Sequence, residues 1–314
     1  MSPTPHLLIP LAASHAEGCR QALQGLALPG LDRLLARLSP LGLDAGSETD
    51  FTPPHERALA RHLGLVAEAP PWAAWRRLQT GAQDALDQAW AFVTPCQWQA
   101  GANHVLLADP AQLRLTEQDS RALLAIVAPW FAEDGITLVY DQPTRWLAQG
   151  KAFSGLATAS LERVTGRDVS AWLPDKQQAR TLHRLNSEMQ MLLYTHPFND
   201  ARAAQGLPPV NAFWVHGAGA LPRAPEAAEE PDMPTTLLEA ALREDWQAWA
   251  DAWKALDAGP VAHLAAHVAK GGRARLTLCG ERSAMAWHHA PRGLGQRIQS
   301  IFRPQRFSSM CEQL

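Results

Sequence analysis

The side chains best suited to hold a ligand lie in one polar segment of the chain. The segment reads His196-Pro-Phe-Asn-x-x-Arg-x-x-x-Gly-x-x-Pro-Val-Asn211, and its candidate ligand-binding residues are His196, Asn199, Arg202 and Asn211. An Arg guanidinium can grip a phosphate or carboxylate through two parallel hydrogen bonds, and the His and Asn side chains could complete a site for an oxygen-rich anion. The same side chains could equally cap the helix end and the turns around them. Both interpretations, anion binding and local structure, are open at this point.

Other residue patterns with catalytic potential are weaker. The chain contains no Walker loop, no GxGxxG after a strand-like run, no GxSxG elbow and no HExxH sequence. His263 and His267 stand one helical turn apart and could share a metal ion, but Leu264 occupies the position where a zinc protease would need Glu. A structural or solvent-facing role is favoured for both histidines. We therefore expect no metal site and no cofactor.

Short apolar runs predict the strands that must position this segment. The polar segment leads directly into residues 212–216, and similar runs occur at 7–11, 136–140 and 275–279. Each run is bounded by Gly, Pro or Asp, which is typical of strands buried in an α/β sheet.

Helical patterns lie between these runs. Thr116 is a suitable N-cap for a helix over 117–131, and Asp175 is suitable for a second helix with Leu182, Leu185, Met189 and Leu192 on one stripe. Thr236 is expected to open a third helix that carries Trp246, Trp249 and Trp253. The alternation predicts an α/β fold with a mainly parallel sheet flanked by helices.

Composition excludes several classes of protein. Of 314 residues, 46% are hydrophobic and 19% charged, and the formal net charge is −3, which argues against disorder and against a nucleic-acid-binding surface. The four cysteines are widely spaced, and the apolar run near the N-terminus is too short to span a membrane. These features predict a cytoplasmic protein without a transmembrane segment. The 12 Trp residues indicate either a stacking site or a bulky core, and their spread along the chain favours the core.

The C-terminal stretch, residues 291–314, is basic. Four Arg residues alternate with Leu294, Ile298, Ile301 and Phe302, so a short amphipathic helix could contact a membrane surface or a partner. A docked or frayed tail is the favoured alternative.

The polar segment resembles the His-Pro-x-Asn-x-x-Arg-x-x-x-Gly-x-x-Pro-Ala-Asn motif of the archaeal-type cofactor-independent phosphoglycerate mutases, which belong to the alkaline phosphatase superfamily. Residues 28–34 and 53–64 also resemble segments of that family, as do Leu256-Asp257 and the run at 275–279. The whole chain is similar as well to a proteobacterial family of RpfE-type regulatory proteins. The resemblance implies an alkaline-phosphatase-like, mainly parallel α/β core over residues 1–94 and 211–290. It further implies an inserted α+β subdomain over 95–210. The basic stretch 291–314 is expected to form a tail after the core.

The chain departs from the family at the positions of the metal ligands and of the nucleophile. The resemblance implies two divalent cations and a Ser or Thr nucleophile. After the first predicted strand, Ala12-Ala-Ser14 stands where the family has Asp-Gly, and Gly280-Glu281 replaces the Asp-His pair after the last. His55, followed by Glu56, occupies the nucleophile position, where an imidazole could accept a phosphoryl group or act as a base.

These departures predict a non-catalytic, phosphoglycerate-mutase-like protein with a regulatory or ligand-binding role. A small phosphorylated metabolite or a regulatory protein is the expected partner. The alternative is an active mutase, phosphatase or phosphotransferase that uses a non-standard site, with His55 and Glu56 as the catalytic candidates.

Overall fold

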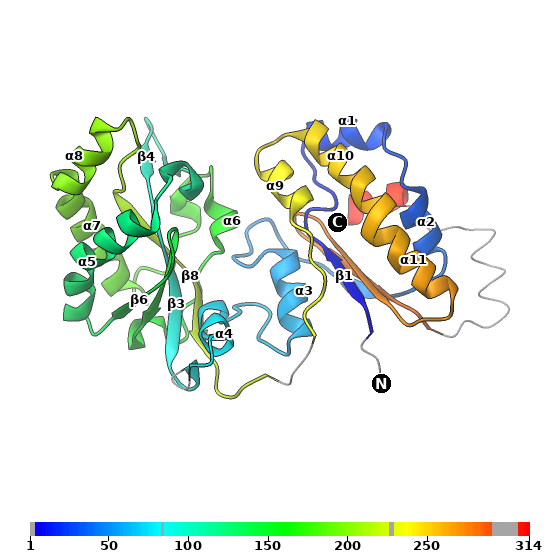
Figure 1. Cartoon of the computed structure of the whole chain (residues 1–314), viewed down its shortest axis with the longest axis horizontal. Coiled ribbons are helices and arrows are strands. Elements are labelled where there is room, and N and C mark those ends of the chain that lie inside the picture. Colours follow the sequence, from blue (N-terminus) through cyan, green and yellow to red (C-terminus); the bar gives the residue numbers. More distant parts are fainter. Residues whose placement is uncertain (1–3, 83–84, 226–228, 291–306) are drawn as a thin grey trace. The chain divides into compact units, whose positions relative to one another are not determined.

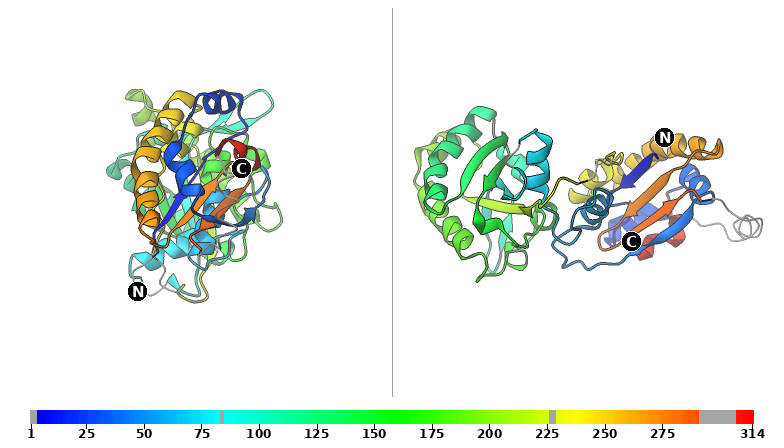
Figure 2. Two further views of the ribbon diagram at one scale, coloured as in Figure 1. Left: turned by 90° about the vertical axis from the view of Figure 1, so that its right-hand side faces the viewer. Right: turned by 90° about the horizontal axis from the view of Figure 1, so that it is seen from below.

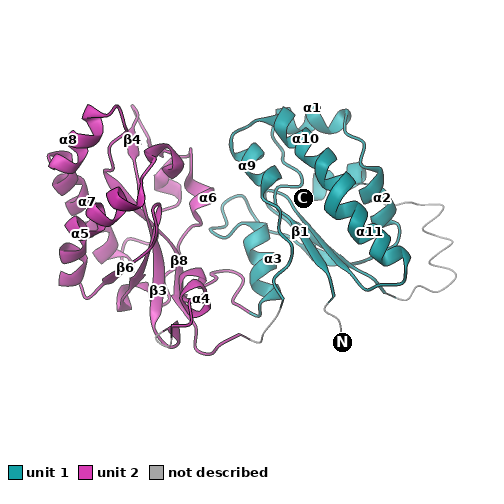
Figure 3. Cartoon of the chain, viewed as in Figure 1, with its two compact units in different colours: residues 1–64, 227–314 teal, residues 65–226 magenta. Residues whose placement is uncertain are grey.

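The computed structural model describes residues 4–82, 85–225, 229–290 and 307–314. The chain forms two compact units, the first from Met1–Gly64 with Ala227–Leu314 and the second from Leu65–Glu226 (Figure 3). The bounds differ from the expected 94/95 and 210/211 because strand β3 (Ala89–Cys96) pairs with strand β8 (Ala212–Ala220). Both strands, and the segments next to them, therefore belong to the second unit.

The first unit is a sheet with helices on both faces (Figures 1 and 2). Its strands are β1 (His6–Ile9), β2 (Ser39–Asp44), β9 (Arg275–Cys279) and β10 (Ala284–His288). Its helices are α1 (Glu17–Gln24), α2 (Pro29–Leu35), α3 (Pro54–His62), α9 (Thr236–Leu242), α10 (Trp246–Leu256) and α11 (Ala262–Ala269), with short turns η5 (Asp257–Val261), η6 (Phe307–Ser309) and η7 (Cys311–Gln313).

The sheet of the first unit is only partly parallel. Its order is β1-β9-β10-β2, in which β1 and β9 run parallel and the other two pairs antiparallel. The expected mainly parallel sheet is thus wrong in this detail. The short link over residues 280–283 explains the difference, because strands joined by a tight turn must run antiparallel.

The core of the first unit lies between this sheet and the helices α1, α2, α10 and α11. Trp249, Trp253 and Trp287 are fully buried there. The indole N–H of Trp249 donates to the Leu11 carbonyl (2.9 Å), and that of Trp253 donates to the Ala12 carbonyl (3.1 Å). These residues form a core, as the sequence favoured, and not an exposed stacking surface.

The second unit is built around an antiparallel sheet in the order β6-β7-β3-β8. Its remaining strands are β4 (Trp98–Ala100), β5 (Val105–Leu107), β6 (Thr137–Gln142) and β7 (Arg145–Gln149). Its helices are α4 (Trp72–Gln79), α5 (Glu117–Glu133), α6 (Leu161–Val164), α7 (Arg180–Tyr194) and α8 (Pro197–Ala204), with turns η2 (Pro110–Leu113), η3 (Lys151–Phe153) and η4 (Val169–Ala171).

Two apolar layers enclose this sheet. Helices α5 and α7 cover one face, where Phe131, Met189 and Phe213 pack around the buried Trp146. Helix α4 covers the other face through Ala73 and Ala74. Between these layers β3 pairs with β8, which is the strand that the polar segment enters.

Three helix predictions have different outcomes. Thr116 caps α5 as expected and forms a reciprocal capping box with Asp119. Asp175 accepts hydrogen bonds from the backbone of Gln177 and Gln178, but this makes a turn, and α7 begins only at Arg180. The helix expected from Thr236 through the Trp residues is two helices, α9 and α10. It breaks at Glu244, which has a left-handed backbone (φ +54°).

The C-terminal tail is partly described. The expected amphipathic stretch at 291–306 lies outside the described residues. Residues 307–314 bury Phe307, Met310, Cys311 and Leu314 in the core of the first unit, as a docked tail would. In the part of the chain that the structure describes, no helix combines the length and apolar character needed to cross a membrane.

Candidate functional site

The polar segment forms the junction between α7, α8 and β8 in the second unit. Pro197 opens α8, and His196 is its N-cap residue: the Nδ1 atom of His196 accepts a hydrogen bond from the Phe198 backbone N–H (3.1 Å). Asn211 stands directly before β8 and pairs with β4, because it accepts from the Trp98 N–H (2.7 Å) and donates to the Trp98 carbonyl (2.9 Å). Both side chains therefore bind the backbone.

Asn199 holds the two ends of the segment together. Its Nδ2 donates to the carbonyls of Leu193 and Val210 (2.8 Å each), and its Oδ1 accepts from the Val210 N–H (3.0 Å). The side chain is buried, so these bonds satisfy backbone groups that water does not reach.

Arg202 is buried as well, at 3% exposure. Its Nε donates to the Pro208 carbonyl (2.9 Å) and its Nη2 to the Leu113 carbonyl, while its buried Nη1 has no hydrogen-bond partner within the described chain. Burial lowers the pKa of Arg202, and the nearby Asp119 partly offsets that effect. Arg202 thus keeps one buried donor, Nη1, that no described residue uses.

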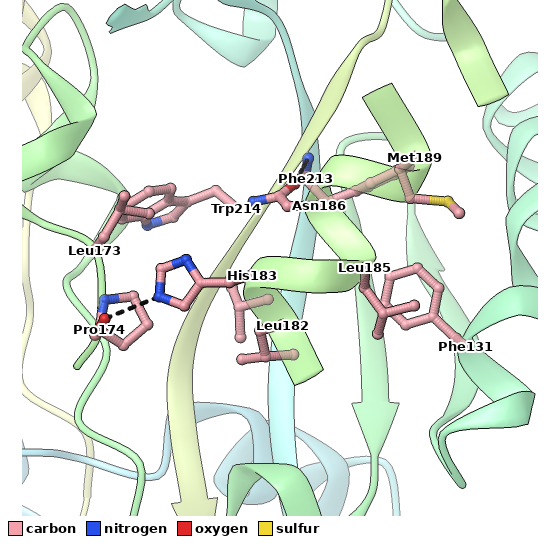
Figure 4. A pocket seen from close by; sticks show the side chains of 11 residues that line it. Phe131, Leu173, Pro174, Leu182, His183, Leu185, Asn186, Met189, Phe213 and Trp214 are labelled. Carbon is pink, nitrogen blue, oxygen red and sulfur yellow. Dashed lines mark hydrogen bonds between the residues drawn. The ribbon is translucent and has the colours of Figure 1, made fainter. Parts of the chain in front are cut away.

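A cavity next to this junction is too small for a metabolite. It lies between α7 and β8, measures about 30 Å³ and is lined mainly by apolar side chains (Figure 4). Its polar members are engaged: the Nε2 of His183 donates to the Pro174 carbonyl (3.1 Å), and the Oδ1 of Asn186 accepts from the Phe213 N–H (3.2 Å). The volume corresponds to about one water molecule.

A second polar cluster of this unit was not foreseen from the sequence. His216, on β8, shares a hydrogen bond with Thr94 Oγ1 (3.1 Å). Burial lowers the pKa of His216 to about 3, and the neighbouring Arg145 adds to the effect. Burial alone would raise the pKa of Asp141, but hydrogen bonds from Arg76 and Arg145 hold it below its usual value. His216 closes the predicted strand 212–216, and no local signal marked it as part of a charged cluster.

In the first unit, hydrogen bonds join the residues that follow β1 to those that follow β9. The Ser14 hydroxyl donates to Glu281 Oε1 (2.8 Å), and the His15 backbone N–H donates to Glu281 Oε2 (3.2 Å). Leu314 is buried beside them, and its carbonyl oxygen accepts from the backbone of Ser283 (3.0 Å). A Cβ at Gly280 would lie 2.3 Å from that oxygen, so only glycine fits there.

His55 and Glu56 also belong to the first unit, in the first turn of α3. The His55 side chain is buried at 5% exposure, so a phosphoryl donor could reach the imidazole only after local opening. Two residues on, Arg57 is buried and donates to Asp44 Oδ2 (3.0 Å) and to the Thr52 carbonyl (2.9 Å). Burial alone would raise the pKa of Asp44, but hydrogen bonds from Arg61 and Arg57 lower it.

The side chains at these strand ends do not fit as ligands of the two divalent cations that the family resemblance implies. Such a site needs several free carboxylate or imidazole ligands. Here both carboxylate oxygens of Glu281 already accept hydrogen bonds, and the neighbouring charged groups include the cations Arg57 and Arg282. Among the described residues, no three His, Cys, Asp or Glu side chains form a group that could hold a metal ion.

Comparison with known proteins yields distant likenesses among solved structures. No protein-family model matches the chain. No curated protein matches it significantly. One similar solved structure is a cofactor-independent phosphoglycerate mutase from Thermoplasma acidophilum, with 14% identity, coverage of 92% of this chain and 90% of that one, and a TM-score of 0.39. Another is the PH0037 protein from Pyrococcus horikoshii, with 12% identity, coverage of 95% and 93%, and a TM-score of 0.48.

We predict that Asn199→Ala lowers the free energy of unfolding of the second unit by about 3 kcal/mol, because three hydrogen bonds to buried backbone groups are lost. Urea unfolding followed by circular dichroism measures the change. Gln205→Ala, at the exposed C-cap of the same helix, is the control and should cost less than about 0.5 kcal/mol. Equal losses in the two variants would show that Asn199 does not hold the junction together.

The lowered pKa of His216 predicts acid sensitivity of the second unit. An unfolded His titrates near pH 6.5, whereas folded His216 stays neutral down to about pH 3. Between these values the unfolded chain binds the extra proton, so stability falls as the pH decreases. Between pH 7 and pH 5 we expect the free energy of unfolding of His216→Gln to fall by about 2 kcal/mol less than that of the wild type. Urea midpoints at the two pH values test this.

The variant His104→Gln, at an exposed position, is the control and should keep the wild-type pH dependence of stability. An unchanged pH dependence in His216→Gln would refute the prediction.

Proposed function

We propose that this chain is a phosphoglycerate-mutase-like protein that has lost metal-assisted phosphoryl transfer and acts by binding a ligand or a regulatory partner. One observation carries the proposal: the carboxyl ends of β1 and β9 are filled by groups of the protein itself. Ser14 and Glu281 are bonded to each other, Leu314 lies against Gly280, and indoles bind the carbonyls of Leu11 and Ala12. A substrate and two cations would have to displace these contacts.

Within the polar segment, one residue supports a role in ligand binding. His196, Asn199 and Asn211 use their side chains to hold the backbone, which makes them scaffold residues in this proposal. Arg202 is the member of the segment with a buried donor, Nη1, that lacks a partner within the described chain. We therefore assign Arg202 as the contact for the anionic group of a small phosphorylated metabolite, which reaches Nη1 only when the junction opens locally, because Arg202 is 3% exposed and the adjacent cavity holds about one water molecule.

The competing function is an active mutase or phosphatase that uses His55. An assay of the purified chain with 3-phosphoglycerate and Mn²⁺, together with metal analysis, separates the two. We expect no turnover above background and no stoichiometric metal, because neither a substrate nor two cations fit the filled strand ends. Turnover that His55→Ala abolishes, or one or more tightly bound metal ions per chain, would contradict the proposal.

We further predict that 3-phosphoglycerate raises the melting temperature of the wild-type chain, since a ligand that binds only the native state stabilises it. Arg202→Gln should abolish the increase, whatever its own melting temperature. The control is Arg180→Gln, which removes an exposed guanidinium from the same unit and should respond like the wild type. An increase that persists in Arg202→Gln would exclude Arg202 as the anion contact. The absence of any increase in the wild type would reject this metabolite as a ligand.

A further inference from the structure

Two cysteines from opposite ends of the chain are buried in the same core. Cys19 lies on α1 and is fully buried, and Cys311 lies on the C-terminal turn η7 with 8% of its surface exposed. Both belong to the apolar cluster between the sheet of the first unit and the helices α1, α2, α10 and α11. The other cysteine of this unit, Cys279, packs on the opposite face of the sheet with Leu8 and Ala284. Cys19 and Cys311 are therefore the two thiols that share this core.

A short series of contacts joins the surroundings of these two thiols. The backbone of Ser14 contacts the Cys19 thiol, and the Ser14 hydroxyl donates to Glu281 Oε1 (2.8 Å). Glu281 follows the glycine against which Leu314 lies. Leu314 ends the C-terminal segment, residues 307–314, which carries the second thiol. The two thiols are thus held in one neighbourhood by contacts at the carboxyl ends of β1 and β9.

The C-terminal segment is attached to the rest of the unit at both of its ends. The Phe307 N–H donates to Asp32 Oδ1 (3.1 Å), and the Leu314 carbonyl accepts from the Ser283 N–H (3.0 Å). Between these anchors the Cys311 thiol donates to the Phe307 carbonyl (3.1 Å). All four cysteines lie in described parts of the chain, and none of them forms a disulfide there. In this state the segment is therefore held by noncovalent contacts.

The two thiols are unreactive while the segment is docked. Burial raises the pKa of Cys311 to about 12, and the nearby Cys19 adds to the effect. Burial also raises the pKa of Cys19 to about 11. Since the thiolate is the form that reacts with oxidants, reaction begins when the segment opens locally and brings Cys311 into water. Cys19 is fully buried on α1, so Cys311 is the thiol that an oxidant meets first.

We propose that Cys19 and Cys311 form a redox-controlled disulfide that locks residues 307–314 onto the first unit. The oxidant is a hydroperoxide. The Cys311 sulfur attacks its terminal oxygen, the O–O bond breaks, and the departing oxygen takes the thiol proton, which leaves Cys311 as a sulfenic acid. When the segment docks again, the Cys19 sulfur attacks the Cys311 sulfur, the S–O bond breaks, and the hydroxyl group leaves with the Cys19 proton as water. The two thiols lose two electrons, which reduce one hydroperoxide.

The lock acts where the carboxyl ends of β1 and β9 are already filled. A disulfide keeps the C-terminal segment, and with it Leu314, against Gly280. Because Cys19 and Cys311 lie near opposite ends of the chain, the bond also closes a very long loop and lowers the entropy of the unfolded state. The proposal does not depend on the phosphorylated ligand, since both cysteines lie in the first unit and Arg202 lies in the second.

Treatment of the full native chain with a small excess of hydrogen peroxide tests the proposal. We expect two of the four thiols counted in denaturant to disappear. Peptide mapping should find the peptides of Cys19 and Cys311 joined, with a mass lower by about 2 Da because two hydrogen atoms are lost. The melting temperature of the oxidised chain should rise by about 5 °C, and dithiothreitol should reverse the rise.

Two variants separate this pair from general oxidation. Cys311→Ser should lose none of its remaining thiols, because buried Cys19 then has no partner. The matched control Cys96→Ser removes a buried thiol from the second unit and should form the disulfide as the wild type does. The proposal is overturned if the wild type keeps all its thiols, if the lost thiols map to Cys96 or Cys279, or if the disulfide joins two chains. Mapping of the wild type needs no substitution, so a variant that fails to fold leaves the test intact.

Discussion

The architecture of the first unit depends on a backbone turn at the carboxyl end of β1. Leu11 there has a left-handed backbone (φ +45°), which costs a non-glycine residue about 1–2 kcal/mol. Three hydrogen bonds hold the turn: Ala12 N–H to the Cys279 carbonyl (2.7 Å), and the Trp249 and Trp253 indoles to the carbonyls of Leu11 and Ala12. Because both indoles come from α10, the same bonds fix that helix on the sheet.

The position of α10 in turn places the buried carboxylate of Asp257 at the start of α2. Asp257 follows α10 directly, and its two oxygens accept from the backbone N–H groups of Gly30 (2.9 Å) and Leu31 (2.6 Å) at the start of α2. A negative charge at a helix N-terminus is favourable, and a Cβ at residue 30 would lie 2.8 Å from this carboxylate. Asp257 therefore stabilises the packing of two helices. Asn199, Arg202 and Asn211 stabilise backbone in the same way in the second unit.

Local patterns in the sequence predicted much of this fold, and non-local pairing explains most of what they missed. Apolar runs identified β1, β6, β8 and β9, and Thr116 correctly marked the start of α5. The partly antiparallel sheet was missed because strand direction depends on the short link after Cys279, which apolar periodicity does not report. The polar segment 196–211 was visible because its residues are consecutive. A cavity beside His6 in the first unit was not, since its walls come from three distant segments.

The two ends of β1 differ in a way that bears on function. In open α/β sheets, ligands usually bind at the carboxyl ends of the parallel strands. In this chain the Trp249 and Trp253 indoles, the Ser14–Glu281 pair and Leu314 occupy that end. At the amino end of the same strand, His6 borders a cavity with acidic walls. A ligand at the usual end would have to displace these contacts, whereas the amino end of β1 leaves open space.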